Sequence, residues 1–289
     1  MNFARLSTRL VAGGATAALA TAGLIGVTTT AAHAAPVSTT YSCTAAGNTF
    51  NVPVSVDIKL LPTSAPAGYP VPASLLSFDS TLTVPGAVQS LIDGTVTNTG
   101  AKSDDFGAAF GDTVAKSPVA WTKPAAADGS GNWVYPGKGA NGAFTLPKAG
   151  TYSVNMPKSF TLVTTGGSAP ITATCTSAAP AQIGTITLSK QKVTIKAKAT
   201  PASVKKGAEV TVKGKVTNEY VKTGGPEVTG KVIIKDGKKK VGTAKIKKGK
   251  FSVKLKGLSV GSHTLTVSYK GDDYTDKGVS KEMKVTVKA

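Results

Sequence analysis

Residues 258–272 read Leu-Ser-Val-Gly-Ser-His-Thr-Leu-Thr-Val-Ser-Tyr-Lys-Gly-Asp, and this stretch decides the fold of the C-terminal part of the chain. From Leu265 to Tyr269 every second residue is apolar, and threonine or serine stands between them. Such alternation is typical of a strand with one buried face. The Gly271-Asp272 pair that follows favours a turn. The stretch therefore predicts a half-buried strand of an all-β domain.

Six further segments of the C-terminal part alternate in the same way, so seven strands can be laid out along the chain. Seven short strands separated by glycine-rich turns are typical of an immunoglobulin-like (Ig-like) sandwich. The side chains that we expect to point inward are Val193/Ile195/Ala197, Val210/Val212/Val216, Val232/Ile234, Val241/Ala244/Ile246, Phe251/Val253/Leu255, Leu265/Val267/Tyr269 and Met283/Val285/Val287.

This part of the chain also resembles the bacterial Ig-like repeat domains of surface and secreted proteins. Besides residues 258–272, the resemblance rests on Pro201-Ala202-Ser203-Val204 with Gly207, on Gly230-Lys231-Val232 and on Val241-Gly242-Thr243-Ala244. It implies an Ig-like fold for residues 191–289 and a role as a spacer or adhesion module, and it names no ligand. This copy departs from its relatives in being saturated with lysine.

Residues 36–178 predict a second all-β domain. From Phe50 to Leu60 apolar residues occupy every second position, which indicates one long half-buried strand, and Pro53 within it suggests a sheet edge or a bulge. Residues 87–92 have the pattern of a helical turn. We expect a β-sandwich joined by a linker at residues 179–190 to the Ig-like domain. This half is only weakly similar to uncharacterised exported modules of Gram-positive bacteria, a similarity that implies no activity.

The N-terminus and the cysteines indicate export. Arg5 and Arg9 precede an apolar stretch, and Ala32-His33-Ala34 has the form of a cleavage site, so residues 1–34 predict a secretory signal peptide. No second apolar stretch approaches the length of a membrane-spanning helix. Cys43 and Cys175 are the only cysteines, and an oxidising compartment favours a structural disulfide between them.

Charge is distributed very unevenly along the chain. Residues 185–289 hold 25 lysines and eight acidic residues, a formal net charge of +17, whereas residues 36–184 hold seven of each sign. Blocks of one sign attract polyanions. The alternative is that lysines only keep strand edges soluble. The lysines that we predict to bind a polyanion are Lys213, Lys215, Lys231, Lys235, Lys238, Lys239, Lys240, Lys245, Lys247, Lys248, Lys254 and Lys256.

The use of lysine and not arginine indicates which kind of polyanion the C-terminal part binds. The only arginines are Arg5 and Arg9, inside the predicted leader. Lysine is a hydrated point charge that suits diffuse attraction to phosphates, whereas nucleic-acid readers combine arginine with aromatic platforms. We therefore expect anionic cell-wall polymers of the teichoic-acid type, or anionic lipid headgroups, and only non-specific binding of nucleic acid.

Catalysis is not expected. Residues 36–178 contain no histidine and no glutamate, and His263 is the only histidine after the predicted leader, which fits a sandwich-corner position better than a catalytic or metal-binding role. A hydrolytic pair among Asp104, Asp105, Asp112 and Asp128 is the remaining catalytic alternative, although loop aspartates usually cap turns. No metal or cofactor is expected.

Together these observations predict a secreted, non-enzymatic protein that is loosely associated with the cell wall through its cationic Ig-like module. The alternative is a glycan-binding protein. In that reading Trp121, Trp133 and Tyr135 are exposed and stack on sugar rings, whereas the opposing interpretation places these aromatic residues in the core.

Overall fold

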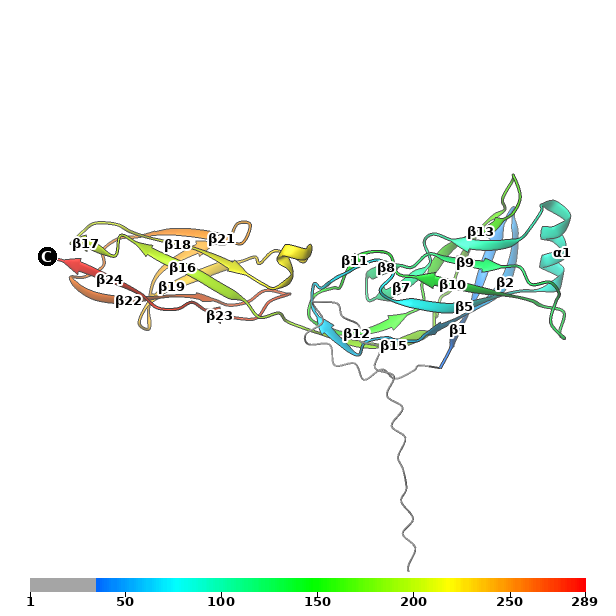
Figure 1. Ribbon diagram of the computed structural model, residues 1–289, viewed down its shortest axis with the longest axis horizontal. Coiled ribbons are helices and arrows are strands. Elements are labelled where there is room, and N and C mark those ends of the chain that lie inside the picture. Colours follow the sequence, from blue (N-terminus) through cyan, green and yellow to red (C-terminus); the bar gives the residue numbers. More distant parts are fainter. Residues whose placement is uncertain (1–34) are drawn as a thin grey trace, which may run out of the picture.

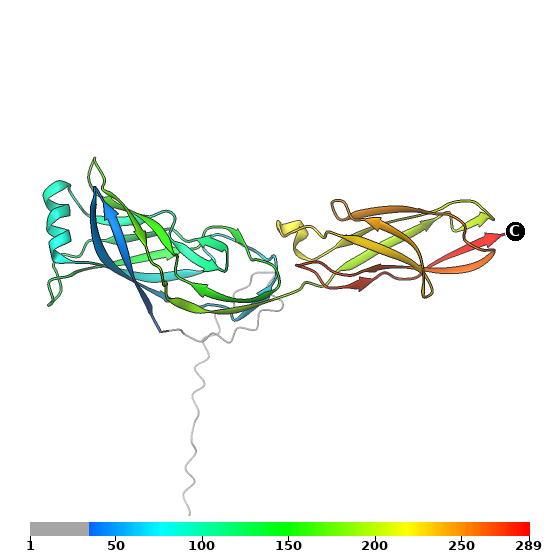
Figure 2. The same ribbon diagram turned by 180° about the vertical axis from the view of Figure 1, so that it is seen from behind.

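The structure, a computed structural model, describes residues 35–289, and the predicted signal peptide lies outside the described residues. Two β-rich units follow one another along the longest axis of the molecule, as Figure 1 and the view from behind in Figure 2 show. The predicted all-β class is confirmed, since the described residues contain one α-helix, α1 (Gly86–Thr95), and one 3-10 helix, η1 (Tyr220–Thr223).

The main sheet of the first unit closes on itself with eight strands. Around the ring they are β1 (Val37–Ala45), β14 (Thr172–Thr176), β13 (Ser159–Thr165), β6 (Gly100–Ser103), β9 (Val119–Thr122), β10 (Trp133–Ala140), β5 (Ser77–Val84) and β2 (Asn48–Ile58). The long strand predicted from Phe50 to Leu60 is β2, and Val52, Val54 and Val56 are buried along it. The pairing of β2 with β5 stops at Val54, next to Pro53, which has no N–H to donate.

A five-stranded sheet completes the first unit. Its order is β3 (Ser64–Pro66), β15 (Gln182–Ser189), β12 (Gly150–Asn155), β7 (Gly107–Phe110) and β8 (Thr113–Lys116), and β4 (Pro70–Val71) pairs separately with β11 (Phe144–Thr145). An open sandwich for residues 36–178 is therefore not what forms, because closing the sheet pairs the edge strands that a sandwich leaves exposed.

Strand β15 occupies most of the stretch expected to be a linker. Residues 182–189 pair with β12 and β3, and Ile183, Ile186 and Leu188 belong to the core of the first unit. The linker predicted at residues 179–190 is thus wrong. These residues alternate between buried and exposed positions like the other strands, and only the short stretch after Ser189 connects the two units.

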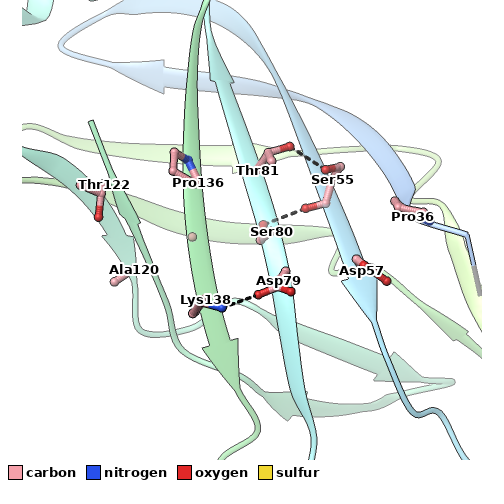
Figure 3. Close-up of a pocket in the computed structure, with 11 residues that line it drawn as sticks. Pro36, Ser55, Asp57, Asp79, Ser80, Thr81, Ala120, Thr122, Pro136 and Lys138 are labelled. Carbon is pink, nitrogen blue, oxygen red and sulfur yellow. Dashed lines mark hydrogen bonds and ion pairs between the residues drawn. The ribbon is translucent and has the colours of Figure 1, made fainter. Parts of the chain in front are cut away.

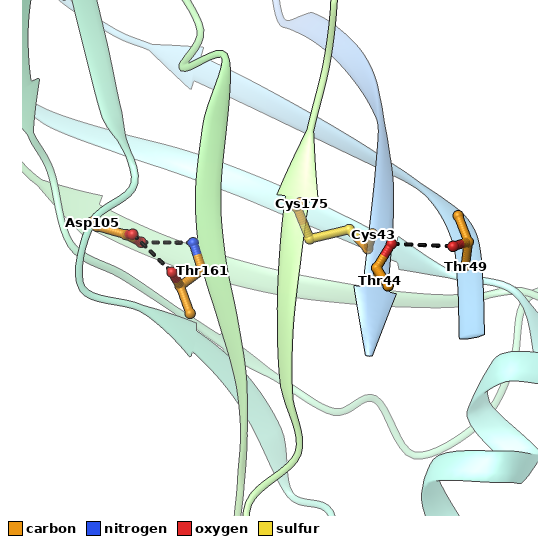
Figure 4. The surroundings of a disulfide bond; sticks show 6 residues. All are labelled: Cys43, Thr44, Thr49, Asp105, Thr161 and Cys175. Carbon is orange, nitrogen blue, oxygen red and sulfur yellow. Dashed lines mark hydrogen bonds between the residues drawn. A yellow bond between two sulfur atoms is a disulfide. The ribbon is translucent and has the colours of Figure 1, made fainter. Parts of the chain in front are cut away.

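The predicted disulfide is confirmed. Cys43 and Cys175 lie directly opposite each other on the neighbouring strands β1 and β14, and both are fully buried (Figure 4). On the next strand, β13, Thr161 donates its backbone N–H and its hydroxyl to the carboxylate of Asp105, which follows β6. The covalent bond therefore joins two strands inside the closed sheet, 132 residues apart in the chain.

The second unit contains the seven predicted strands and two short further ones, β17 (Ser203–Lys205) and β23 (Gly278–Val279). β16 (Thr194–Thr200), β18 (Val210–Thr217) and β21 (Lys250–Leu255) form one sheet, and the other contains β17, β24 (Met283–Lys288), β22 (Gly261–Tyr269), β19 (Lys231–Asp236) and β20 (Lys239–Lys245), with β23 beside β22. The core includes Val212, Ile234, Leu265 and Val267, all from the sets expected to point inward. These are the two packed sheets expected of an Ig-like sandwich, antiparallel except for the parallel pair β17 and β24.

The two units touch through a compact junction. The ring of Tyr69 meets that of Tyr220 edge to face with centroids 5.0 Å apart, and Tyr274 packs against the core of the first unit. The backbone N–H of Ala149 donates to the carbonyl of Asp273 at 3.0 Å. The side-chain amide of Gln191 donates to the carbonyl of Ala67. Side-chain and backbone contacts thus fix one unit against the other.

Candidate functional site

The three-stranded sheet of the second unit carries a dense group of lysines on its outer surface. Along β16, β18 and β21 the apolar side chains point inward, so the lysines that alternate with them are exposed to solvent. We call this surface the lysine face. Its members are Lys196, Lys198, Lys213, Lys215, Lys250 and Lys254.

The strand register sets three of these lysines in one row. Lys196 lies directly opposite Lys215, and Lys215 lies directly opposite Lys250. The next row pairs Lys198 with Lys213. Directly opposite residues have Cβ atoms about 5 Å apart, at which distance like charges destabilise a sheet. The lysine face therefore holds its positive charge at a cost to the fold.

Acidic residues balance only one end of the lysine face. Glu209 forms ion pairs with Lys254 at 3.1 Å and Lys256 at 2.8 Å. Hydrogen bonds from Lys256 and Lys254 hold the pKa of Glu209 below its ordinary value. No ion pair joins Lys196, Lys215 or Lys250 to any residue within 35–289. The centre of the face is thus uncompensated.

The structure does not bring all twelve predicted lysines together. Lys213, Lys215, Lys254 and Lys256 belong to the three-stranded sheet and its end. The other eight lie on or beside the edge hairpin of the second sheet, and they are Lys231, Lys235, Lys238, Lys239, Lys240, Lys245, Lys247 and Lys248. The lysine face instead gains Lys196, Lys198 and Lys250. Alternation alone indicated that these three are exposed, but only the register shows which strands are neighbours.

His263 is buried and carries structural contacts. Its Nδ1 lies 2.7 Å from the Asp236 carboxylate, and its Nε2 lies 2.8 Å from the carbonyl oxygen of Ser259. The hydrogen bond to Asp236, followed by that to Ser259, raises the pKa of His263 above its ordinary value. The ring thereby ties the start of β22 to the β19–β20 hairpin, which supports the structural interpretation of this histidine.

The aromatic residues proposed for sugar stacking do not form an exposed platform. Trp121 is fully buried and donates its Nε1 hydrogen to Ser80 at 3.1 Å. Tyr135 is fully buried and donates its hydroxyl to Gln89 at 2.5 Å. Trp133 is half-buried, with the Lys123 ammonium 4.9 Å from the ring centroid. The exposed placement of Trp121 and Tyr135 is therefore wrong, because inward positions of β9 and β10 carry them.

Three of the four aspartates considered for catalysis have structural partners, and the fourth, Asp112, is exposed in the turn between β7 and β8. Asp128 accepts hydrogen bonds from the backbone N–H groups of Ser130 and Asn132, each at 2.9 Å, which makes it a turn cap. Asp104 forms an ion pair with Lys102 at 3.0 Å. Burial raises the pKa of the Asp105 carboxyl. Hydrogen bonds from Thr161 and Ser103 lower that pKa by a larger amount, so it lies below its ordinary value. These contacts match the common role of loop aspartates.

Two further observations concern residues 35–289 as a whole. No three side chains of histidine, cysteine, aspartate or glutamate gather there in a way that could hold a metal ion. In the same range, no helix has the length and apolar character needed to cross a membrane.

Two families match the chain. Residues 40–187 are similar to a family of unknown function, DUF6801, a match that spans slightly more than half of the chain. Residues 197–288 are similar to the bacterial Ig-like domain (group 3), so the Ig-like domain indicated by residues 258–272 is confirmed. No curated protein matches.

Similarity to solved structures is distant. The fibronectin(III)-like modules of CbhA from Clostridium thermocellum share 19% identity over 33% of this chain and 94% of that chain, with a TM-score of 0.27. A putative membrane anchored protein from Corynebacterium diphtheriae shares 17% over 88% of this chain (TM-score 0.31), and the adhesin InvE from Yersinia pseudotuberculosis shares 16% over 78% (TM-score 0.31). The match spans 59% and 57% of the length of these last two proteins.

Proposed function

Because the chain belongs to a family of unknown function, DUF6801, and also carries a bacterial Ig-like domain, we propose that it is a secreted, non-enzymatic binding protein of the bacterial cell envelope. The lysine face of the Ig-like unit is its contact surface, and the partner is an anionic polymer whose repeating charge is a phosphate. Teichoic-acid-type wall polymers have this chemistry.

The observation that carries the proposal is the uncompensated row Lys196–Lys215–Lys250. A solubility role does not require three lysines directly opposite one another, because spacing them along the edges keeps strands apart without repulsion. A flexible chain of phosphates relieves that repulsion along the whole row. Each phosphate that replaces small counterions contributes binding free energy that weakens as salt rises.

A test compares two variants of the full chain that lose the same charge. The ladder variant changes the row to glutamine, and the control variant changes three exposed lysines outside the three-stranded sheet, none of which lies opposite another lysine. The ladder variant is Lys196→Gln, Lys215→Gln and Lys250→Gln, and the control variant is Lys270→Gln, Lys281→Gln and Lys284→Gln.

Binding to isolated cell walls and to purified inorganic polyphosphate is measured across a salt series. Walls stripped of teichoic acid and vesicles of anionic lipid are measured in parallel, so that wall phosphate and lipid phosphate are distinguished. The association constant falls as salt rises, and we expect the plot of its logarithm against log salt to be less steep for the ladder variant by about two. The control variant should reduce the steepness less. Equal losses in both variants show that net charge alone acts, and they refute the lysine face as the contact surface.

A further inference from the structure

A groove of about 710 Å³ lies on the outer face of the closed sheet of the first unit, across β2, β5, β10 and β9 (Figure 3). It is hollow because the side chains that point outward from these strands are small. The small residues that line it are Ser55, Thr81, Ala120, Thr122 and Pro136. Its volume lies within the usual range of small-molecule sites.

The register arranges the groove as two parallel rows. Ser55, Thr81 and Pro136 lie opposite one another in the first row, which presents hydroxyl groups and one flat apolar ring. Asp57, Asp79 and Lys138 form the second row, which is charged (Figure 3). Hydrogen-bond acceptors, a donor and an apolar surface are therefore present side by side.

Asp79 has all the partners that a carboxylate needs. Lys59 and Lys138 approach it from two sides, each at 2.9 Å. Hydrogen bonds from Lys59, then from Lys138, lower the pKa of Asp79 to about 2. This side chain is therefore ionised and occupied by contacts within the sheet.

Asp57 differs from Asp79 in having no such partner. It lies directly opposite Asp79, so two carboxylates face each other across neighbouring strands. Its Oδ1 is shielded from solvent, and no hydrogen-bond donor from the described residues reaches it. A shielded oxygen without a donor and an opposed like charge both cost stability. Lys59, which also contacts Asp79, offsets part of the repulsion. No described residue donates a hydrogen bond to Asp57, however, and its carboxylate oxygen that is not shielded is available to a ligand in the groove.

We propose that this groove binds a neutral glycan. Sugar hydroxyls donate hydrogen bonds to the Asp57 carboxylate and accept them from the Lys138 ammonium and the Thr122 hydroxyl, while the Pro136 ring contacts the apolar C–H face of a sugar. Asp57, Asp79, Lys59 and Lys138 have a formal charge sum of zero, so the groove has no preference for the polyanion that suits the lysine face. This proposal uses none of the three aromatic residues considered above.

The proposal is independent of polyanion binding by the other unit. The test is calorimetric titration of the full chain with neutral hexasaccharides, namely maltohexaose, cellohexaose, xylohexaose and chitohexaose, at high ionic strength, where the lysine face is screened. We expect at least one of them to bind. Absence of binding to all four overturns the proposal.

Two variants locate the site. Asp57→Asn removes the charged acceptor, and we expect about tenfold weaker binding, the effect of losing one hydrogen bond to a charged group. Ala120→Tyr fills the groove from an exposed strand position that suits tyrosine, and we expect it to abolish binding. Asp112→Asn, the same chemical change in the exposed β7–β8 turn, is the matched control and leaves binding unchanged.

The thermal unfolding midpoint of the same variants distinguishes a ligand-binding role of Asp57 from a structural one. Because Asp57 is opposed by Asp79 and lacks a donor, Asp57→Asn leaves the unfolding midpoint unchanged or raises it. A clear fall in that midpoint reveals a structural partner of the carboxylate and overturns the proposal. Glycan binding that survives both Asp57→Asn and Ala120→Tyr overturns it as well.

Discussion

His263, which is buried, and Asp236, which is partly exposed, form an ion pair that joins two neighbouring strands of the Ig-like unit. The imidazole Nδ1 lies 2.7 Å from the carboxylate, and the other ring nitrogen lies 2.8 Å from the Ser259 carbonyl. Both neighbours are acceptors, so both ring nitrogens are satisfied only when each carries a hydrogen, that is, in the charged imidazolium. The geometry thus selects the protonated ring.

The stability of the Ig-like unit should therefore depend on pH. The folded-state pKa of His263 is raised above 6.5, first by the hydrogen bond to Asp236 and then by that to Ser259. Stabilisation by the proton is complete below the unfolded-state pKa near 6.5 and is lost as pH rises through the folded-state pKa. We expect the free energy of unfolding, measured by urea titration followed by circular dichroism, to fall over that interval.

The variant His263→Gln isolates this contribution. It removes the titrating group and leaves the Asp236 carboxylate with a weaker partner, so we expect it to be less stable by about 1–3 kcal/mol at pH 6. The difference in unfolding free energy between the wild type and the variant should shrink as pH rises. A constant difference across the range contradicts a role for the imidazolium.

The disulfide predicts a large and local effect. It closes a loop with a sequence separation of 132 residues, and we expect Cys43→Ser with Cys175→Ser to lower the unfolding free energy of the first unit by about 2–5 kcal/mol. Trp121 and Trp133 both lie in that unit, so tryptophan fluorescence reports its unfolding alone. If the fluorescence-detected urea midpoint is unchanged, the disulfide does not restrict the conformations of the unfolded chain enough to stabilise the first unit.

The strands of the Ig-like unit could be read from the sequence because each has one buried and one exposed face. Val210 and Val212 alternate with Thr211 and Lys213, and the structure buries the two valines. The closed sheet of the first unit could not be read in this way. Alternation fixes which face of a strand is buried, but not its neighbours. The predicted disulfide indicated that β1 lies near β14, but the closure of the sheet through the other strands was not predictable.

The candidate binding surfaces were likewise predictable in the exposure of their residues but not in which residues are neighbours. That the lysines are exposed was predictable residue by residue, but the row Lys196–Lys215–Lys250 depends on register and joins segments far apart in the chain. The groove was missed for the same reason, since Ser55, Asp57 and Lys138 have no unusual sequence context. Their small or charged side chains form a groove only because strands β2 and β10 lie on either side of β5.

The junction predicts that Gly68 fixes the orientation of the two units. A Cβ at this position would lie 2.5 Å from Cγ of Pro226 and 3.0 Å from Cδ1 of Tyr274, both in the Ig-like unit. We expect Gly68→Ala to push the units apart and loosen the contact between Tyr69 and Tyr220. Small-angle X-ray scattering should then show a broader range of interdomain distances than in the wild type.

Gly47→Ala is the matched control for this change. Gly47 and Gly68 both have positive φ, +79° and +68°, so the backbone strain is similar, but a Cβ at Gly47 meets nothing within 4 Å. We expect scattering from Gly47→Ala to match the wild type. Identical scattering from both variants means that the junction absorbs the extra methyl group and does not depend on Gly68.

The row of lysines predicts a gain in stability when it is removed. Because Lys215 is flanked directly by Lys196 and Lys250, the ladder variant loses two repulsive pairs, and we expect its unfolding free energy to rise by about 1 kcal/mol at low salt. The gain should diminish as salt shortens the Debye length to about 10 Å and below. The control variant, whose lysines do not oppose one another, should gain less.

Polyphosphate should reverse this order of stability. It binds the folded wild type and raises its thermal midpoint, and it should raise that of the ladder variant much less, because a ligand stabilises in proportion to its affinity for the folded state. The measurement is thermal unfolding of the three proteins with and without polyphosphate at one salt concentration. A ladder variant that is less stable than the wild type at low salt shows that the lysines support the fold, which contradicts a lysine face whose repulsion a bound polyanion relieves.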